Sequence, residues 1–106
     1  MIAADSAVHA MVDRIVVRFR PRRVILFGSR ARGTATASSD VDLLVVFDEL
    51  PSTRQAAIEV RRALADLPLA KDIVVTTTDE IARRGKMVGS ILRTALSEGS
   101  IIYERA

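Results

Sequence analysis

The chain has 106 residues, with 16 lysines and arginines against 13 aspartates and glutamates, which gives a net charge of +3. This length predicts one domain, and 49% hydrophobic with 27% charged residues is typical of a globular chain rather than a disordered one. The absence of cysteine and the single histidine exclude disulfides and cysteine- or histidine-rich metal sites, so any metal must be held by oxygen ligands. The small charge excess and the 4% aromatic content argue against direct binding of nucleic acid.

No segment has the pattern of a targeting signal or a membrane span. The chain starts without basic residues, and an acid follows at once at Asp5. No apolar run approaches the roughly 18 residues that a membrane-spanning helix needs. We therefore expect a cytoplasmic protein, folded as a single domain over residues 1–106.

The pattern of apolar residues alternates between helical and strand periods along the chain. It predicts, in order, a helix over residues 5–19, a strand over 24–27, a loop with one helical turn over 28–39, a strand over 41–47, a helix over 51–67, a strand over 72–76, a helix from 77 to Gly99 and a strand over 100–103. Asp5 or Ser6 can cap the first helix, and Thr77 with Glu80 has the spacing of a capping box. The alternation predicts an α/β or α+β domain.

A turn of small and basic residues follows the first predicted strand. Gly28 allows the chain to turn sharply, and Ser29 can open a helical turn whose backbone N–H groups favour phosphate oxygens. Arg30 and Arg32 add positive charge, and guanidinium groups suit phosphates. The turn lacks the lysine of a P-loop and the glycine pattern of a serine-hydrolase elbow. It is therefore a candidate phosphate-binding turn that is neither a P-loop nor a serine-hydrolase elbow.

Two acidic residues stand at the start of the second predicted strand. Asp40 and Asp42 are two positions apart, so their carboxylates point to the same face of a strand. A divalent cation would relieve their repulsion, and Asp72 at the start of the third predicted strand can add a third carboxylate. Each residue alone fits a structural role, but their order and spacing together predict a metal site for displacement at phosphorus.

Residues 28–33 read Gly-Ser-Arg-Ala-Arg-Gly, and residues 39–45 read Ser-Asp-Val-Asp-Leu-Leu-Val. Together they resemble the signature of the minimal nucleotidyltransferases of the DNA polymerase beta superfamily, and the ten residues between Ser29 and Asp40 suit that signature. Residues 95–104 also resemble the end of those small proteins. The resemblance covers nearly the whole chain and implies a mixed sheet of about four strands with helices mainly on one face.

The resemblance implies a role for each candidate residue. The implied contacts to the triphosphate of ATP are Gly28, Ser29, Arg30 and Arg32. The implied ligands of Mg²⁺, or of Mn²⁺ in its place, are Asp40, Asp42 and Asp72. Asp72 would also act as the base on the acceptor hydroxyl.

The resemblance further implies a function and a partner. Family members of this length commonly act as antitoxins that inactivate a HEPN-type RNase toxin by adding AMP to a tyrosine, which implies a hetero-oligomer with the toxin. Two alternatives stay open: a nucleotidyltransferase for a small-molecule hydroxyl, and an antitoxin with a relict site that works by binding alone. Leu44 and Val46 share the strand face of Asp42, so this face needs cover from the last helix, a second copy or a partner.

Overall fold

The computed structural model describes residues 3–33, 40–84 and 91–105. Its strands are β1 (Arg23–Phe27), β2 (Val41–Phe47), β3 (Lys71–Thr77) and β4 (Ser100–Glu104). They form one sheet in the order β3-β2-β1-β4, in which β1 is antiparallel to β2 and to β4 while β2 and β3 are parallel. The mixed four-stranded sheet predicted from the sequence is confirmed.

The helices are α1 (Ala3–Phe19), α2 (Ser29–Arg32), α3 (Thr53–Ala63), α4 (Thr78–Arg84) and α5 (Ile91–Glu98). The cap predicted for the first helix is wrong, because α1 already begins at Ala3, before Asp5 and Ser6. The helix predicted from residue 77 to Gly99 is described as α4 and α5, and residues 85–90 between them lie outside the described part. Within the described part, no helix has the length and apolarity needed to cross a membrane.

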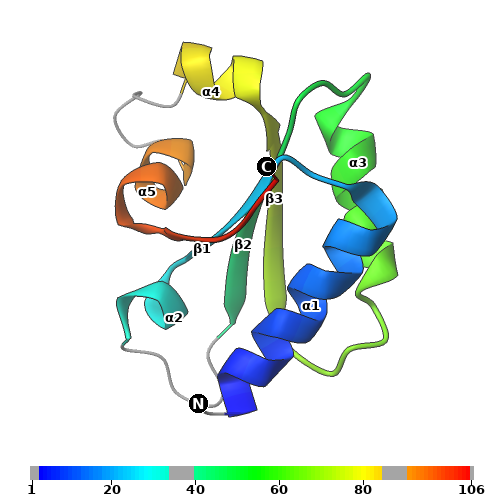
Figure 1. Cartoon of the computed structure of the whole chain (residues 1–106), viewed down its shortest axis with the longest axis vertical. Helices are drawn as coiled ribbons and strands as arrows, with labels where there is room; N and C mark the ends of the chain where they lie inside the picture. Colours follow the sequence, from blue (N-terminus) through cyan, green and yellow to red (C-terminus); the bar gives the residue numbers. More distant parts are fainter. Residues whose placement is uncertain (1–2, 34–39, 85–90, 106) are drawn as a thin grey trace.

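The two long helices α1 and α3 lie on one side of the sheet, and α4 and α5 lie on the other (Figure 1). The larger core joins α1 and α3 to one face of the sheet through side chains that include Met11, Ile15, Val60, Leu43 and Ile73. The smaller core joins α5 to the opposite face through Ile25, Phe27, Leu44, Val46, Leu92 and Ala95. The sequence left three possible covers for the sheet face of Leu44 and Val46: the last helix, a second copy or a partner. In the structure the last helix, α5, packs on this face.

Side-chain caps begin two of the helices. The Ser52 hydroxyl accepts a hydrogen bond from the backbone N–H of Gln55 (3.1 Å) at the start of α3. The Thr77 hydroxyl accepts one from the backbone N–H of Glu80 (3.1 Å) at the start of α4, as the capping-box spacing predicts. These caps fix the residues at which α3 and α4 begin.

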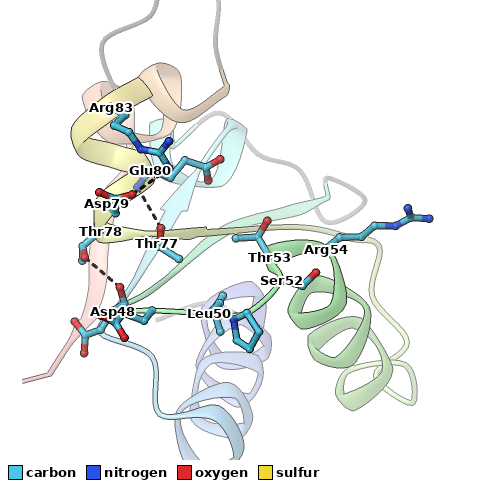
Figure 2. A pocket seen from close by; sticks show the side chains of 12 residues that line it. Asp48, Leu50, Ser52, Thr53, Arg54, Thr77, Thr78, Asp79, Glu80 and Arg83 are labelled. Atoms are coloured by element: carbon cyan, nitrogen blue, oxygen red, sulfur yellow. Dashed lines mark hydrogen bonds and ion pairs between the residues drawn. The ribbon is translucent and has the colours of Figure 1, made fainter.

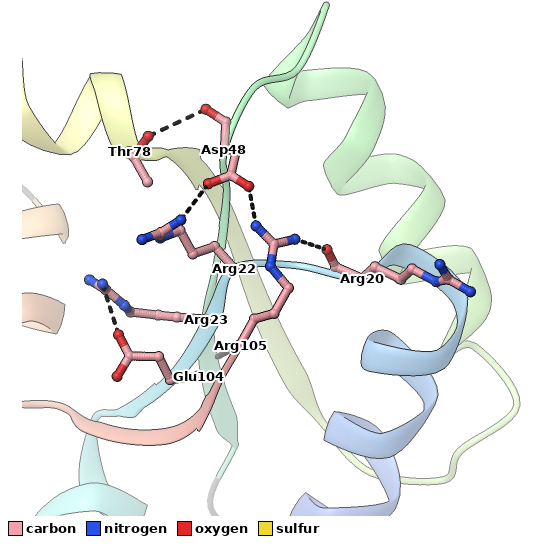
Figure 3. Close-up of polar contacts among 7 residues, drawn as sticks. All are labelled: Arg20, Arg22, Arg23, Asp48, Thr78, Glu104 and Arg105. Carbon is pink, nitrogen blue, oxygen red and sulfur yellow. Dashed lines mark hydrogen bonds and ion pairs between the residues drawn. The ribbon is translucent and has the colours of Figure 1, made fainter.

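Asp48 ties together the ends of three strands, next to the start of α4 (Figure 3). Its carboxylate accepts hydrogen bonds from Arg105 and from Arg22, the latter at 3.1 Å. The Thr78 hydroxyl donates to the Asp48 carbonyl (3.3 Å), and the Arg105 backbone N–H donates to the Arg22 carbonyl (2.9 Å). Because these residues lie just outside β1, β2 and β4, the cluster holds the C-terminal strand to the sheet.

We expect Asp48→Asn to lower the melting temperature at neutral pH. The hydrogen bond from Arg105 is the main cause that holds the pKa of Asp48 below its ordinary 3.8, so the folded state favours the carboxylate. The resulting stabilisation is present above pH 3.8 and is lost as the pH falls through the lowered pKa. Thermal unfolding at several pH values should show the difference from wild type shrinking in acid. A difference that does not depend on pH would refute the ionic origin.

Candidate active site

Two of the predicted site residues, Asp42 and Asp72, lie in one row across the sheet with Phe27, which directly precedes Gly28. Asp42 in β2 is directly opposite Asp72 in the parallel strand β3 and opposite Phe27 in the antiparallel strand β1. Because neighbouring strands lie about 4.8 Å apart, the row brings the two carboxylates and the turn after Phe27 close together. Asp40 lies directly before β2 and is exposed. The sheet thus gathers residues that are up to 44 positions apart between Gly28 and Asp72.

The Asp42 carboxylate lies where a side chain at Gly28 would have to go. A Cβ built on Gly28 would lie 2.2 Å from Oδ2 of Asp42 and 3.0 Å from its Cγ. Gly28 also has φ 76° and ψ −158°, a conformation that is nearly exclusive to glycine. Only glycine therefore leaves room for the carboxylate at the end of β1.

Asp42 is the electrostatic centre of the site. It is partly buried, and this burial raises its pKa above the ordinary 3.8, with further increases from the negative charges of Asp72 and Asp40. Arg32 acts in the opposite direction and lowers the pKa of Asp42. The three predicted carboxylates and one predicted phosphate ligand are thus close enough to act on each other.

The turn predicted to bind phosphate forms the short helix α2, which begins at Ser29 directly after Gly28. The Gly28 carbonyl accepts hydrogen bonds from the backbone N–H groups of Ala31 (3.1 Å) and Arg32 (3.2 Å). Ser29 and Arg30 are partly buried, whereas Arg32 is exposed at the end of the helix. The helical turn predicted after the first strand is confirmed, and it carries its two arginines on the Gly28 side of the row.

The carboxylates fit a divalent cation in their chemistry. Oxygen ligands are those that Mg²⁺ and Mn²⁺ prefer, and a cation would offset the repulsion that, after burial, raises the pKa of Asp42. In this structure the side chains do not form a complete metal site. Within residues 3–33, 40–84 and 91–105, no three Asp, Glu, His or Cys residues are grouped closely enough to hold a metal ion. The residues that would hold it are Asp40, Asp42 and Asp72, and their role as metal ligands stays a prediction.

A cavity of about 950 Å³ lies at the opposite ends of β2 and β3 (Figure 2). Twelve residues line it, among them Asp48, Ser52, Thr77 and Glu80. None of the seven predicted site residues is among them. The cavity is therefore separate from the row of Asp42 and Asp72.

Sequence reasoning did not single out Glu98 at the end of α5. Its carboxylate pairs with the guanidinium of Arg32 at 3.7 Å, and both side chains are about half exposed. Gly99 follows it, and a Cβ there would lie 2.3 Å from the Ala95 carbonyl oxygen and 2.5 Å from a side-chain carbon of Ile25. This tight turn places Glu98 beside α2. No local pattern links two residues that far apart in the chain.

Comparisons with known proteins agree with this arrangement. The family described as nucleotidyltransferase domain matches residues 11–102. The protein adenylyltransferase MntA of Thermococcus cleftensis is 44% identical over 100 residues, which cover 93% of this chain and 90% of that protein. A protein of Methanocaldococcus jannaschii, named as a candidate protein adenylyltransferase, is 52% identical over 46 residues, and the match spans only 29% of that longer protein.

A solved structure supports the same fold. A Sulfolobus solfataricus protein, whose crystal structure is described as that of a candidate nucleotidyltransferase, has a TM-score of 0.67 to this chain at 22% identity. The match covers 94% of this chain and 79% of that one. At this identity the likeness concerns the fold, while the family match over residues 11–102 concerns the sequence itself. The chain belongs to the nucleotidyltransferase domain family, as the Gly28–Ser29 turn and the paired aspartates predict.

Proposed function

We propose that this protein is an adenylyltransferase that transfers AMP from ATP to a hydroxyl of a partner protein. The observation that carries the proposal is the 44% identity to a protein adenylyltransferase over nearly the full length of both chains. The Gly28 turn and the facing pair of Asp42 and Asp72 support it, since the turn suits phosphate binding, the partly buried Asp42 suits metal binding and the outer Asp72 suits proton removal. We further propose that the partner is a HEPN-type RNase toxin, that the acceptor is a tyrosine and that this chain is the antitoxin.

The residues on the α2 side of the row would bind the triphosphate. Arg32 is exposed there, and its guanidinium suits phosphate oxygens. Arg30 adds a second positive charge in the same turn. Gly28 has no side chain, so a phosphate could approach the backbone closely where the turn meets Asp42. A triphosphate in this place would have its α-phosphate beside the carboxylates and its pyrophosphate end toward α2.

The carboxylates would perform the transfer. Asp40 and Asp42, together with Asp72, would hold Mg²⁺, which when bound would draw negative charge away from the phosphate under attack. Asp72 would take the proton of the acceptor hydroxyl. The hydroxyl oxygen forms a bond to the α-phosphorus, the bond between the α-phosphorus and the bridging oxygen to the β-phosphate breaks, and pyrophosphate leaves. Asp72 suits the role of base because it lies at the outer end of the row and is exposed to an incoming acceptor.

Label transfer tests the proposal directly. The protein is incubated with Mg²⁺, ATP labelled at the α-phosphate and the product of the adjacent gene, and we expect label on that partner. Asp40→Ala and Asp72→Asn should each reduce transfer by about 100-fold or more, since they remove charges placed at the reacting phosphate. Asp13→Ala, an exposed aspartate on α1, should leave transfer unchanged.

The same assay separates the alternatives. Label that moves to a small molecule but never to a protein would favour a small-molecule acceptor. Full neutralisation of the partner by Asp40→Ala without label transfer would favour an antitoxin that works by binding alone. Normal transfer by Asp72→Asn would remove Asp72 from the proposed mechanism and leave Asp40 and Asp42 in it.

A further inference from the structure

A shallow groove runs along the outer edge of β3. Among the strands that the structure describes, β3 ends the sheet, because it pairs with β2 alone. The groove has a volume of about 380 Å³ and lies between β3 and α3. Its walls are Thr53, Arg54, Ala57 and Arg61 from α3 and residues 72–75 from β3. Asp72, the proposed base, thus lies at the end of the groove. Neither the family match nor the names of the relatives assign a role to this groove.

Two arginines of α3 give the groove a positive charge. Arg54 and Arg61 are seven positions apart, which is close to two helical turns, so they lie on one side of the helix about 10 Å apart. Arg61 donates a hydrogen bond to the Ile73 carbonyl (2.9 Å), which holds its guanidinium against the strand edge. Arg54 is exposed, and its side chain extends away from the 950 Å³ cavity that it also borders (Figure 2).

The groove lies on the side from which an acceptor must approach. In an in-line displacement the attacking oxygen and the leaving group stand on opposite sides of the phosphorus. The row runs from the Gly28 turn and α2, past Asp42, to Asp72 at the edge of the sheet. Pyrophosphate that leaves toward α2 therefore requires an acceptor that arrives over β3.

We propose that this groove binds an extended acidic segment of the acceptor protein, whose hydroxyl residue then faces Asp72. The inference rests on the proposed protein adenylyltransferase function. The edge of β3 offers backbone hydrogen-bonding groups to an added strand except at the Ile73 carbonyl, which Arg61 occupies, and the positive charges of Arg54 and Arg61 select acidic side chains. A residue added opposite Asp72 would lie about 5 Å away, within reach of the carboxylate. The hydroxyl proton then passes to Asp72 as the bond to phosphorus forms.

Peptide binding tests the groove apart from catalysis. Two fluorescein-labelled peptides carry a single tyrosine flanked either by glutamates or by lysines, and their binding is measured by fluorescence anisotropy without ATP. Wild type should bind the acidic peptide at least about tenfold more tightly than the basic one. Arg54→Glu should weaken binding of the acidic peptide about tenfold and raise the KM for its adenylylation, with little change in kcat.

Arg62→Glu is the matched control. Arg62 is also an exposed arginine of α3, but it borders a different cavity, with Arg18 and Phe19. It should change binding less than about twofold. Equal losses in Arg54→Glu and Arg62→Glu, or no preference of wild type for the acidic peptide, would refute the groove. Circular dichroism confirms that both variants are folded.

The two proposals fail in different ways. Selective peptide binding that depends on Arg54, without AMP transfer to any protein or peptide, would uphold the groove as a peptide site and refute the adenylyltransferase function. AMP transfer that is indifferent to Arg54 and to acidic flanks would uphold the function and refute the groove.

Discussion

Gly28→Ala is expected to reduce AMP transfer by about 100-fold or more, because a displacement of about 1 Å at a reacting centre has an effect of this size. The new Cβ would lie 2.2 Å from Oδ2 of Asp42, so the carboxylate must move out of the row with Asp72. Alanine also disfavours φ 76° with ψ −158°, so the turn into α2 is strained in addition. Transfer of labelled AMP to the partner measures the effect, and thermal unfolding shows whether the variant remains folded.

Gly33→Ala separates the contact with Asp42 from the loss of a glycine. Gly33 ends α2 with a positive φ of 77°, like the 76° at Gly28, though with ψ 14° in the left-handed helical region, and a Cβ there meets no atom of the described residues within 4 Å. This variant should lose about 1 kcal/mol of stability from backbone strain and keep transfer within a few-fold of wild type. Equal losses of activity in both variants would show that strain in the turn, and not the displaced carboxylate, is what matters.

Each end of the four predicted strands lies within one residue of the end that the structure shows. Val24 to Phe27 is an apolar run that ends at Gly28, and Val41 to Phe47 is apolar except for Asp42 and lies between two acids; such local patterns decide where a buried strand begins and ends. The Gly28–Ser29 turn was predictable for the same reason. The contact of Gly28 with Asp42 was not, because it depends on which residues of β1 and β2 stand opposite each other.

The remaining features depend on contacts between distant segments. Asp72 was predicted as the third carboxylate, but its exact alignment with Asp42 comes from pairing of β2 with β3. The helix predicted over 51–67 ends at Ala63. At its end the backbone N–H of Leu64 donates to the carbonyls of Arg61 and Arg62, which are nearer in the chain than the acceptor of a regular helical turn. The apolar period continues past that point, so periodicity alone overruns the helix end. The groove beside β3 could not be predicted, since the strand order leaves β3 at the edge.

Asp42→Asn is expected to abolish transfer and at the same time to stabilise the fold at neutral pH. Burial and the charges of Asp72 and Asp40 raise the pKa of Asp42 above 3.8, so the folded state binds its proton more tightly than the unfolded state does. Its contribution to stability is favourable below pH 3.8 and is lost as the pH rises through the raised pKa. Asparagine removes this penalty, which solvent screening limits to a gain of roughly a few degrees in melting temperature.

Thermal unfolding at several pH values, with and without Mg²⁺, tests each part of this prediction. Without the metal, Asp42→Asn should melt above wild type at neutral pH, and the difference should shrink as the pH falls toward 3.8. Mg²⁺ should raise the melting temperature of wild type and leave that of Asp42→Asn nearly unchanged, because a cation that binds only the folded state stabilises it. A variant that melts below wild type at neutral pH would refute the repulsion inferred for Asp42, and an equal effect of Mg²⁺ on both proteins would exclude Asp42 as a ligand. Opposite signs for activity and stability would mean that the chain keeps three repelling carboxylates together for chemistry, at a cost to its fold.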